Sequence, residues 1–538
     1  MLVSRRLFMQ SAAAAAAAQT TPGKRPNIIL IMADDMGFSD IGCYGGEIAT
    51  PNLNALAKGG IRFTQFYNNA RCCPTRATLM TGLYPHQAGI GHMMEDRKLP
   101  AYRGDLNKQC VTIPQVLKSA GYRTYMAGKW HVTPVNNSKH NWPLQRGYDK
   151  FYGTIHGAGS FYDPVTLTRD NDPIKPDKPD YYYTDALSDQ AVAYIGEAAN
   201  KPEPFCLYLA YTSPHWPLHA LESDIAKYRG RYKQGWDALR AERHKRMLSM
   251  GIVNRNWPIT QRDPSVPAWA EEPYKDWQQQ RMEVYAAQID RMDQGIGRVL
   301  AKLKETGVED DTLVLFLADN GGCAEELRPI RDESRRALHV PKSTPDGKPV
   351  KDGNIPTLRP GPYDTYQSYG VGWANASNTP FRLYKHWVHE GGIASPLIAR
   401  WPRAIRKTGG LTAEIAHLID IMATCADVGG AQYPSTFQGN SITPLEGKSL
   451  KPVFETGKRA GHAEVFWEHE GNRAVRQGKW KLVSRWPGKW ELFDMAADRT
   501  ELNDLAKTNP KKLEELSAKW EAWAKRCNVL PWDQVPKG

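Results

Sequence analysis

The chain has 538 residues, of which 41% are apolar and 24% charged, and its formal net charge is +12. This composition excludes a disordered or fibrous chain, and the length allows two or more domains with a large core. Beyond the N-terminal region no apolar stretch is long enough to cross a bilayer, since the strongest, TLVLFLAD at 312–319, has the length of a buried strand.

The N-terminus resembles a twin-arginine export signal. It reads MLVSRRLFMQSAAAAAAAQ, in which Arg5 and Arg6 precede an apolar triplet and an alanine run. We expect a signal peptide over 1–22 with cleavage near Ala18, hence a periplasmic or secreted bacterial protein exported in the folded state by the twin-arginine translocase. The alternative is a basic N-terminal helix that stays attached.

The positive charge persists without the signal, because +12 less the two arginines leaves +10. An exported protein seldom meets nucleic acid, so we expect no nucleic-acid partner. A surface suited to anionic substrates accounts better for the charge.

Predicted strands and helices alternate from residue 26 to residue 319. The expected strands are 26–35, 61–67, 122–128, 205–211 and 312–319, and the expected helices are 52–60, 75–82, 112–121, 184–199 and 278–305. Such alternation favours an α/β fold with a large, mostly parallel or mixed sheet and helices on both faces. We assign residues 23–460 to this domain, interrupted by two long polar insertions at 219–277 and 323–378.

The pattern changes after residue 460. The segments EVFWE, RAVRQGKWKLV and WELFDM are short alternating strands, with a turn near Gly478, and a helix is expected at 511–525. Residues 461–538 are therefore predicted to form a smaller antiparallel sheet with one helix.

Acidic and amide side chains follow two of the predicted strands. Asp34 and Asp35 end the first, and Asp319 and Asn320 end the strand at 312–319. Ligands bind outside the carboxyl ends of strands in open α/β sheets, and oxygen ligands alone favour Ca²⁺ or Mg²⁺. Either pair alone is also a common turn sequence, but together they predict a site for a hard cation.

Basic side chains follow other strand ends. They are Lys129 and His131 in GYRTYMAGKWH, His215 in YTSPHWP, and Lys385, His386 and His389 in FRLYKHWVHEGG. Each alone is more often a solvated or capping residue. Gathered at one edge around a cation, they describe a site where a tetrahedral anion is cleaved.

Two adjacent cysteines open the short helix predicted at 75–82. Near a helix N-terminus the pKa of Cys72 is expected to fall, so the residues alone indicate either an activated nucleophile or a buried structural pair with Cys73. A thiolate that attacked an anionic ester would give a stable covalent adduct with no evident route for its breakdown. The spacing of the eight cysteines predicts neither a zinc site nor a dense disulfide framework.

These motifs resemble the sulfatase family. CCPTRATLMTG is similar to the first family signature, GYRTYMAGKWH to the second, and MADDMGFSDIGCYGG with TPNLNALAKGG to the N-terminal metal strand and helix. The likeness runs to GKWKLV and WELFDM, covers essentially the mature chain, and is greatest to bacterial arylsulfatases. It implies a sulfuric ester hydrolase that releases sulfate and an alcohol or phenol.

The resemblance also selects one cysteine. Formylglycine-generating or radical SAM enzymes modify a cysteine that has Pro at +2 and Arg at +4, which from Cys72 are Pro74 and Arg76; Cys73 fails this test. The hydrated aldehyde has two hydroxyls on one carbon, so that one can attack sulfur and the other can expel sulfate. Cys72 is therefore the predicted formylglycine.

The family implies roles for the remaining residues. Asp34, Asp35, Asp319, Asn320 and the modified Cys72 would bind one Ca²⁺ or Mg²⁺. Arg76 and Lys129 would hold the formylglycine, and His131 would assist elimination of sulfate. His215 and Lys385 would contact the sulfate, one of them protonating the leaving oxygen, whereas His386 and His389 are expected to be structural.

Three alternatives stand beside this interpretation. A phosphonate monoester hydrolase or phosphodiesterase of the same superfamily can use the same modified cysteine. A two-zinc alkaline phosphatase is disfavoured, because it would need histidine ligands and a Ser or Thr nucleophile. A non-catalytic protein that binds sulfated glycans should show a broken nucleophile or metal set, and none is visible. The sequence leaves open whether the substrate is an aryl, alkyl or carbohydrate sulfate.

Overall fold

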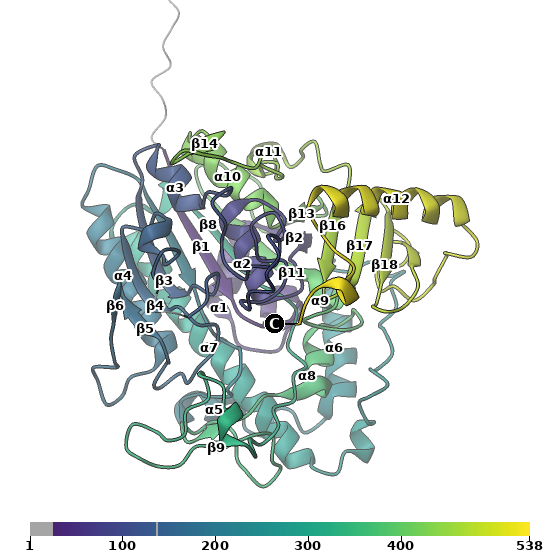
Figure 1. Ribbon diagram of the computed structural model, residues 1–538. Coiled ribbons are helices and arrows are strands. Elements are labelled where there is room, and N and C mark those ends of the chain that lie inside the picture. Colours follow the sequence, from purple (N-terminus) through teal and green to yellow (C-terminus); the bar gives the residue numbers. More distant parts are fainter. Residues whose placement is uncertain (1–24, 136–137, 538) are drawn as a thin grey trace, which may run out of the picture.

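A mixed sheet of eleven strands forms the centre of the protein (Figure 1). The structure is a computed structural model that describes residues 25–135 and 138–537, so the predicted signal peptide at 1–22 lies outside the described residues. The strand order is β12-β2-β11-β8-β1-β7-β3-β4-β5-β6, with β13 paired to β2. The bounds are β1 Asn27–Ala33, β2 Ile61–Tyr67, β3 Arg123–Lys129, β4 Lys150–Thr154, β5 Leu167–Arg169, β6 Asp172–Pro173, β7 Phe205–Ala210, β8 Thr312–Ala318, β11 Ala394–Arg400, β12 Gly410–Thr412 and β13 Ala416–His417.

Helices cover both faces of this sheet. One face packs against α1 (Pro51–Lys58), α4 (Tyr183–Ala199) and α7 (Lys275–Glu305); the other packs against α2 (Cys72–Thr81), α3 (Ile113–Lys118) and α10 (Ile419–Gly429). Along β1, Ile29 and Ile31 point into the first core while Ile28 and Leu30 point into the second. Because successive strand residues face opposite sides, a strand buried on both faces favours apolar residues throughout, which explains the continuous apolar run at 28–33.

The predicted fold class is confirmed, and one central strand was missed. Strand β11 runs antiparallel between β2 and β8 and makes the sheet mixed. Its sequence, ASPLIAR, contains Pro396, a residue that argues against a central strand. The register with β2 shifts between Ser395 and Leu397, and this irregularity accommodates the proline.

The two polar insertions carry structure of their own. The first holds α5 (Glu222–Ile225) and α6 (Gly235–Ser249), and the second holds β9 (Lys351–Asp352), β10 (Thr365–Tyr366) and α8 (Gly370–Ser377). Trp236 and Trp269 of the first pack against Trp373 of α8, with ring centroids 4.7–5.7 Å apart. The sequence did not predict α6, because charged residues are frequent in it and its apolar periodicity is weak.

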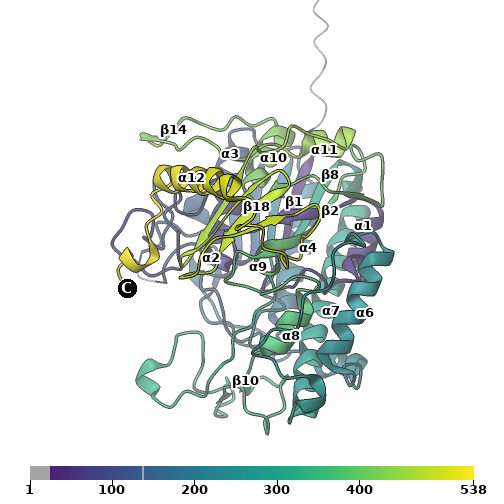
Figure 2. The same cartoon turned by 90° about the vertical axis from the view of Figure 1, so that its right-hand side faces the viewer.

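The C-terminal residues form an antiparallel sheet in the order β16-β17-β18-β19, with α12 (Pro510–Arg526) lying across it (Figure 2). The strands are β16 Val465–His469, β17 Asn472–Gln477, β18 Trp480–Ser484 and β19 Glu491–Asp494. Val475 and Leu482 pack with Trp520 and Trp523 of α12, whereas Trp467 and Val483 join the core of the large sheet. The boundary at residue 460 stays a prediction.

The shorter elements are α9 Glu390–Ile393, α11 Lys451–Thr456, β14 Thr436–Phe437 and β15 Asn440–Ser441. Among the described residues, no helix combines the length and the apolarity that crossing a membrane requires.

Candidate active site

The candidate site lies at one edge of the large sheet. Strands β8, β1, β7 and β3 are neighbours and parallel, so their carboxyl ends meet there. Asp34 and Asp35 follow β1, Asp319 and Asn320 follow β8, and Lys129 ends β3. Strand β11 is antiparallel to both β8 and β2, so its amino end and the carboxyl end of β2 lie at this edge too. This topology brings Lys385, which precedes β11, and Cys72, which follows β2, to the same place.

Three buried carboxylates share this edge with buried cations. Lys129 Nζ lies 2.6 Å from Asp34 Oδ2, and an Arg76 guanidinium nitrogen lies 2.8 Å from Asp319 Oδ2 and 3.6 Å from Asp34 Oδ2. All four of these side chains are 0% exposed. The opposite charges compensate one another, as charges removed from water require.

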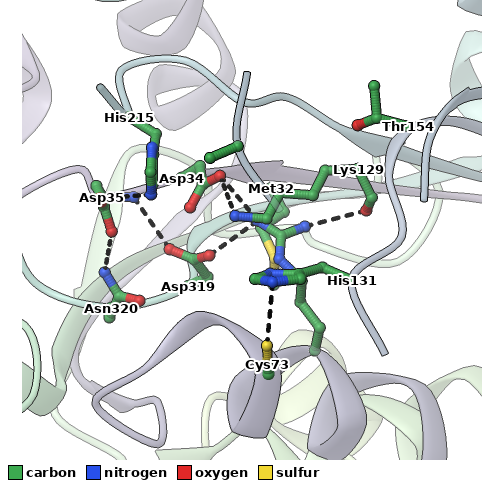
Figure 3. Close-up of polar contacts among 12 residues, drawn as sticks. Met32, Asp34, Asp35, Cys73, Lys129, His131, Thr154, His215, Asp319 and Asn320 are labelled. Atoms are coloured by element: carbon green, nitrogen blue, oxygen red, sulfur yellow. Dashed lines mark hydrogen bonds and ion pairs between the residues drawn. The ribbon is translucent and has the colours of Figure 1, made fainter. Parts of the chain in front are cut away.

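Asp35 is the centre of a second group of contacts (Figure 3). Its Oδ2 lies 2.9 Å from Lys385 Nζ and 3.3 Å from His215 Nε2, and its Oδ1 accepts a hydrogen bond from Asn320 Nδ2 at 2.7 Å. Its backbone N–H donates to Asp319 Oδ1 at 3.1 Å. The two acidic pairs that the sequence placed at separate strand ends are therefore directly linked.

The carboxylates differ in their electrostatics. Burial raises the pKa of Asp34 and, together with the charge of Asp34, raises the pKa of Asp319 well above its usual range. Burial acts in the same direction on Asp35, but Lys385 and His215 outweigh it and hold the pKa of Asp35 below its ordinary value.

The donor set fits a hard divalent cation. Asp34 Oδ1 and Asn320 Oδ1 are buried and accept no hydrogen bond, although neighbouring oxygens in the same group do. Unpartnered buried oxygens are costly unless a positive group meets them. Carboxylate and amide oxygens are the ligands that Ca²⁺ and Mg²⁺ take, and a cation here would also lower the raised carboxylate pKa values.

Cys72 is the first residue of α2 and is 2% exposed. The pKa of Cys72 lies well below its usual value. A hydrogen bond from Cys73 is the main cause, and the nearby Lys129 and His131 lower the pKa further, whereas burial acts in the opposite direction. The pKa of Cys73 is raised, chiefly by burial. The structure thus distinguishes the two adjacent cysteines, and the helix N-terminus adds favourable dipole charge at position 72.

Cys73 also reaches the site, which the sequence did not predict. Its Sγ lies 3.3 Å from His131 Nε2 (Figure 3). Burial lowers the pKa of His131 to about 3, so that its ring is neutral at neutral pH and can accept a proton. No spacing rule identifies this contact, because it depends on the turn between β3 and the following segment.

His215 is likewise held neutral, since burial lowers its pKa to about 4. Its Nδ1 lies 2.6 Å from the carbonyl oxygen of Trp216, which fixes the proton on that nitrogen, and its Nε2 lies 3.5 Å from Lys385 Nζ. The two residues therefore form one unit, in which the ammonium group faces the free ring nitrogen. His215 can donate a proton from Nε2 only after Lys385 has supplied one to that nitrogen.

Backbone strain is concentrated around these residues. Asp35, Ala70, His131 and His386 have φ values of 62, 61, 56 and 91°. Residues other than glycine rarely adopt this left-handed region, and such strain persists where the surrounding contacts impose it. Each of these four residues belongs to the site or adjoins a residue of it.

A cavity opens beside Lys385. Its volume is about 340 Å³, and its lining includes Arg71, Glu325, Tyr384 and His386. Glu325 lies 3.0 Å from Arg71, 4.0 Å from Lys385, and accepts a hydrogen bond from Trp216 Nε1 at 2.8 Å. Neither Glu325 nor Arg71 was predicted from the sequence.

A row of rings adjoins His131 and His215. The centroids of His131 and His156 are 5.9 Å apart, those of His156 and His339 are 5.1 Å apart, and those of His339 and Trp216 are 5.4 Å apart. Trp216 in turn packs on His215 at 4.4 Å. His339 comes from the insertion at 323–378, so this insertion contributes a residue to the wall of the site.

All ten residues predicted for catalysis or metal binding therefore gather at one edge of the sheet, and their individual roles remain predictions. Of the two histidines expected to be structural, His389 pairs with Glu491 at 3.0 Å. His386 instead lines the cavity and contacts Glu470 at 3.3 Å.

Comparisons with known proteins agree with this arrangement. A sulfatase family model matches residues 26–431, and a model of the N-sulphoglucosamine sulphohydrolase C-terminal region matches residues 381–525. An uncharacterized sulfatase of Schizosaccharomyces pombe is 34% identical over 94% of this chain and 95% of its own, and an arylsulfatase of Klebsiella aerogenes is 33% identical over 82% and 95%.

Among solved structures, that of Ps i-CgsB in complex with k-i-k-neocarrahexaose has the same fold, with a TM-score of 0.67 and 24% identity over 96% of this chain and 95% of that one. The family model spans most of the chain, and the residues that carry the resemblance converge in the structure. The chain belongs to the sulfatase family of hydrolases.

Proposed function

We propose that this sulfatase cleaves sulfate monoesters with a formylglycine formed from Cys72 and one bound Ca²⁺ or Mg²⁺. The observation that carries the proposal is the position of Cys72 at the start of α2, between the cationic side chain of Lys129 and the neutral ring of His131. When present, the hydrated aldehyde would supply a hydroxyl nucleophile, and the cation would neutralise charge on the ester.

The protein residues would act as follows. Asp34, Asp35, Asp319 and Asn320 would hold the cation through their oxygens. Arg76 and Lys129 would orient the modified residue and balance the carboxylates. His131, neutral at pH 7, would accept the proton released when sulfate departs. His215 and Lys385, 3.5 Å apart, would contact the sulfate, and one of them would donate a proton to the leaving oxygen.

The charge of the site favours a sulfate ester over a phosphate ester. One divalent cation with Arg76, Lys129 and Lys385 faces three carboxylates, which is less positive than a two-metal phosphatase site. A sulfate monoester carries one negative charge at neutral pH, whereas a phosphate monoester carries nearly two. The singly charged ester therefore matches the site better.

We further propose a sulfated carbohydrate as the natural substrate. The leaving group would bind between the ring wall of Trp216, His339 and His156 and the polar wall of Arg71 and Glu325. Rings stack on a sugar face, while the charged pair can bond its hydroxyls. The match of residues 381–525 to an N-sulphoglucosamine sulphohydrolase region supports a sugar substrate.

Export and maturation complete the proposal. A formylglycine-generating or radical SAM enzyme would modify Cys72 in the cytoplasm, and the twin-arginine translocase would then carry the folded protein to the periplasm or beyond. The support for this order is the paired arginines at the N-terminus, because that route exports folded chains.

The test is a side-by-side comparison of three esters with metal-replete enzyme that bears formylglycine. We expect kcat/KM to be highest for 4-nitrophenyl sulfate, lower for bis(4-nitrophenyl) phosphate and lowest for 4-nitrophenyl phosphate. A clear preference for the phosphodiester, or for a phosphonate monoester, would assign the protein to the related hydrolases of the superfamily. A panel of sulfated sugars then tests the substrate class.

A further inference from the structure

A second group of potential metal ligands lies at the tip of the C-terminal sheet. His469 ends β16, and Glu470 and Gly471 form the turn into β17. This turn meets His386, the residue after Lys385. Ligand atoms of His386, His469 and Glu470 all lie within 4.8 Å of one another.

The carboxylate of Glu470 lies between the two imidazoles. His386 Nδ1 is 3.3 Å from Glu470 Oε2, and His469 Nε2 is 3.6 Å from Glu470 Oε1. These separations are close to the distances between ligand atoms around a tetrahedral ion with bonds of about 2.0–2.2 Å.

His469 has no other explanation in the described structure. Its side chain is 0% exposed, and neither ring nitrogen makes a hydrogen bond among the described residues. A buried polar group left without a partner costs about 1–3 kcal/mol, and such a group calls for an ion or a water. Burial keeps the pKa of His469 well below its usual value, so the ring is neutral, which is the form that binds a metal.

Outer contacts hold Glu470 in place. Arg97 Nε donates to His92 Nδ1 at 3.3 Å, which puts the proton of His92 on Nε2, and this nitrogen donates to Glu470 Oε1 at 2.7 Å. Hydrogen bonds of this kind orient ligands at metal sites. Glu470 also has a φ of 50° and His386 a φ of 91°, so two of the three residues keep strained backbones.

We propose that His386, His469 and Glu470 form a second metal site, which takes a divalent transition metal such as zinc. Two imidazoles and one carboxylate are a borderline donor set that suits zinc, in contrast to the oxygen-only set at Asp34 and Asp319. The remaining coordination positions belong to water. The proposal does not depend on the sulfatase mechanism.

Binding a metal at His386 Nδ1 requires the single ring proton, which this nitrogen otherwise directs at Glu470, to move to Nε2. The contact from Asn472 Nδ2 to Nε2 at 3.3 Å is then given up. Asn472 keeps its hydrogen bond to the carbonyl of His469 at 2.9 Å. The exchange costs one long hydrogen bond and keeps the proton on the ring.

The ion would link two parts of the chain near the catalytic residues. The backbone N–H of His386 donates to the carbonyl of Ala70 at 2.7 Å, two residues before Cys72, and the N–H of Lys385 donates to the carbonyl of Gly322 at 3.1 Å. A metal at His386 would therefore fasten the tip of the small sheet to the segment that carries Lys385.

Cobalt(II) is the probe that tests this site. The full chain is stripped with chelator, saturated with Ca²⁺ to fill the oxygen site, and titrated with Co²⁺. We expect one cobalt per chain with visible d–d absorption, and one zinc per chain by elemental analysis after zinc is added instead. Thiolate ligation by Cys72 or Cys73 would add strong near-ultraviolet bands, whose absence assigns the spectrum to the imidazole site.

Glu470→Gln and His386→Gln keep the size of partly exposed side chains and should each abolish stoichiometric cobalt binding. His92→Gln should weaken it by about 10–100-fold, the usual effect of losing an outer contact. His389→Gln, which changes a nearby histidine that pairs with Glu491, is the matched control and should bind cobalt as the wild type does. A wild-type chain without visible cobalt bands, or a Glu470→Gln chain that keeps them, overturns the proposal.

Discussion

Lys129 Nζ lies 2.6 Å from Asp34 Oδ2, and neither side chain is exposed to solvent. The contact crosses β7, which lies between the strands that carry these two residues. It places a fixed positive charge directly against the proposed cation ligands. The ammonium group of Lys129 would therefore neutralise the same carboxylates as a cation bound at Asp34.

The loss of Lys129 should be partly compensated by calcium. Among the described residues, Lys129→Ala leaves the Asp34 carboxylate with the Arg76 ion pair at 3.6 Å alone, and breaking a buried pair costs about 3–5 kcal/mol. We expect Ca²⁺ to raise the free energy of unfolding of this variant more than that of the wild type, as measured by urea titration. Lys118→Ala removes an equally short but exposed pair with Asp149 and should cost less than about 1 kcal/mol. If Ca²⁺ raised the free energy of unfolding by the same amount in Lys129→Ala and in the wild type, Lys129 would not act on the cation site.

Cys72, and not Cys73, should carry formylglycine when the chain is produced with a modifying enzyme. Only Cys72 has Pro at +2 and Arg at +4. Tandem mass spectrometry of the tryptic peptide 72–76 should place a loss of about 18 Da, thiol to aldehyde, on the first residue. Cys73→Ser should keep most activity, because a hydroxyl can replace the thiol beside His131. Modification at Cys73, or an active Cys72→Ala enzyme, would refute this assignment.

His215→Ala should discriminate between leaving groups. A sugar alcohol needs a proton as it departs, whereas 4-nitrophenolate needs little, and general acid catalysis contributes about 10²–10⁴-fold. We expect kcat for a sulfated sugar to fall by about 10²-fold or more and kcat for 4-nitrophenyl sulfate to fall much less. If both substrates lose the same factor, His215 positions the sulfate without donating a proton, and Lys385 becomes the acid.

His339→Ala tests the row of rings beside His131 and His215. Its ring packs 5.1 Å from His156 and 5.4 Å from Trp216, and one such contact is worth about 0.5–1.5 kcal/mol. The kcat/KM for ring-bearing sulfates should drop by about 2–10-fold, the equivalent of that energy, while a small alkyl sulfate should be nearly unaffected. His244→Ala, in α6 of the other insertion, is the control. If kcat/KM fell by the same factor for all esters, His339 would stabilise the fold without contacting the leaving group.

Acid should destabilise the protein through its buried histidines. His219 is 1% exposed, and burial lowers its pKa to about 4. Between an unfolded-state pKa of about 6.5 and this value the unfolded chain holds a proton that the folded chain excludes, so stability falls as the pH falls through this window. His219 alone should lower the free energy of unfolding by about 3 kcal/mol between pH 7.5 and pH 4.

The measurement is the free energy of urea unfolding at both ends of that window. His219→Gln should show a shallower loss of stability toward acid than the wild type, although it is less stable at neutral pH because contacts to Phe161 and Thr365 are weakened. His140→Gln, which changes a histidine at an exposed position, is the matched control. An identical slope for His219→Gln and wild type would contradict the buried neutral state.

The sequence by itself determined the fold class and the family, and it predicted the ten residues that gather at one edge of the sheet. Continuous apolar runs such as 28–33 are typical of strands buried on both faces, and the signatures around Cys72 and Lys129 identify the family. Local patterns of this kind are set by burial and by chemistry that acts over a few residues, which is why they can be read without coordinates.

The tertiary structure decided the rest. It placed β11 in the centre of the sheet despite Pro396, brought Cys73 to His131, and turned His386 from an expected structural residue into a neighbour of Glu470 and the cavity. It also carried His339 of an insertion to the ring of His156. These contacts join residues distant in sequence, and their geometry depends on strand order and strained turns. Such pairings are imposed by the packing of the whole chain and leave no periodic signal in any one segment.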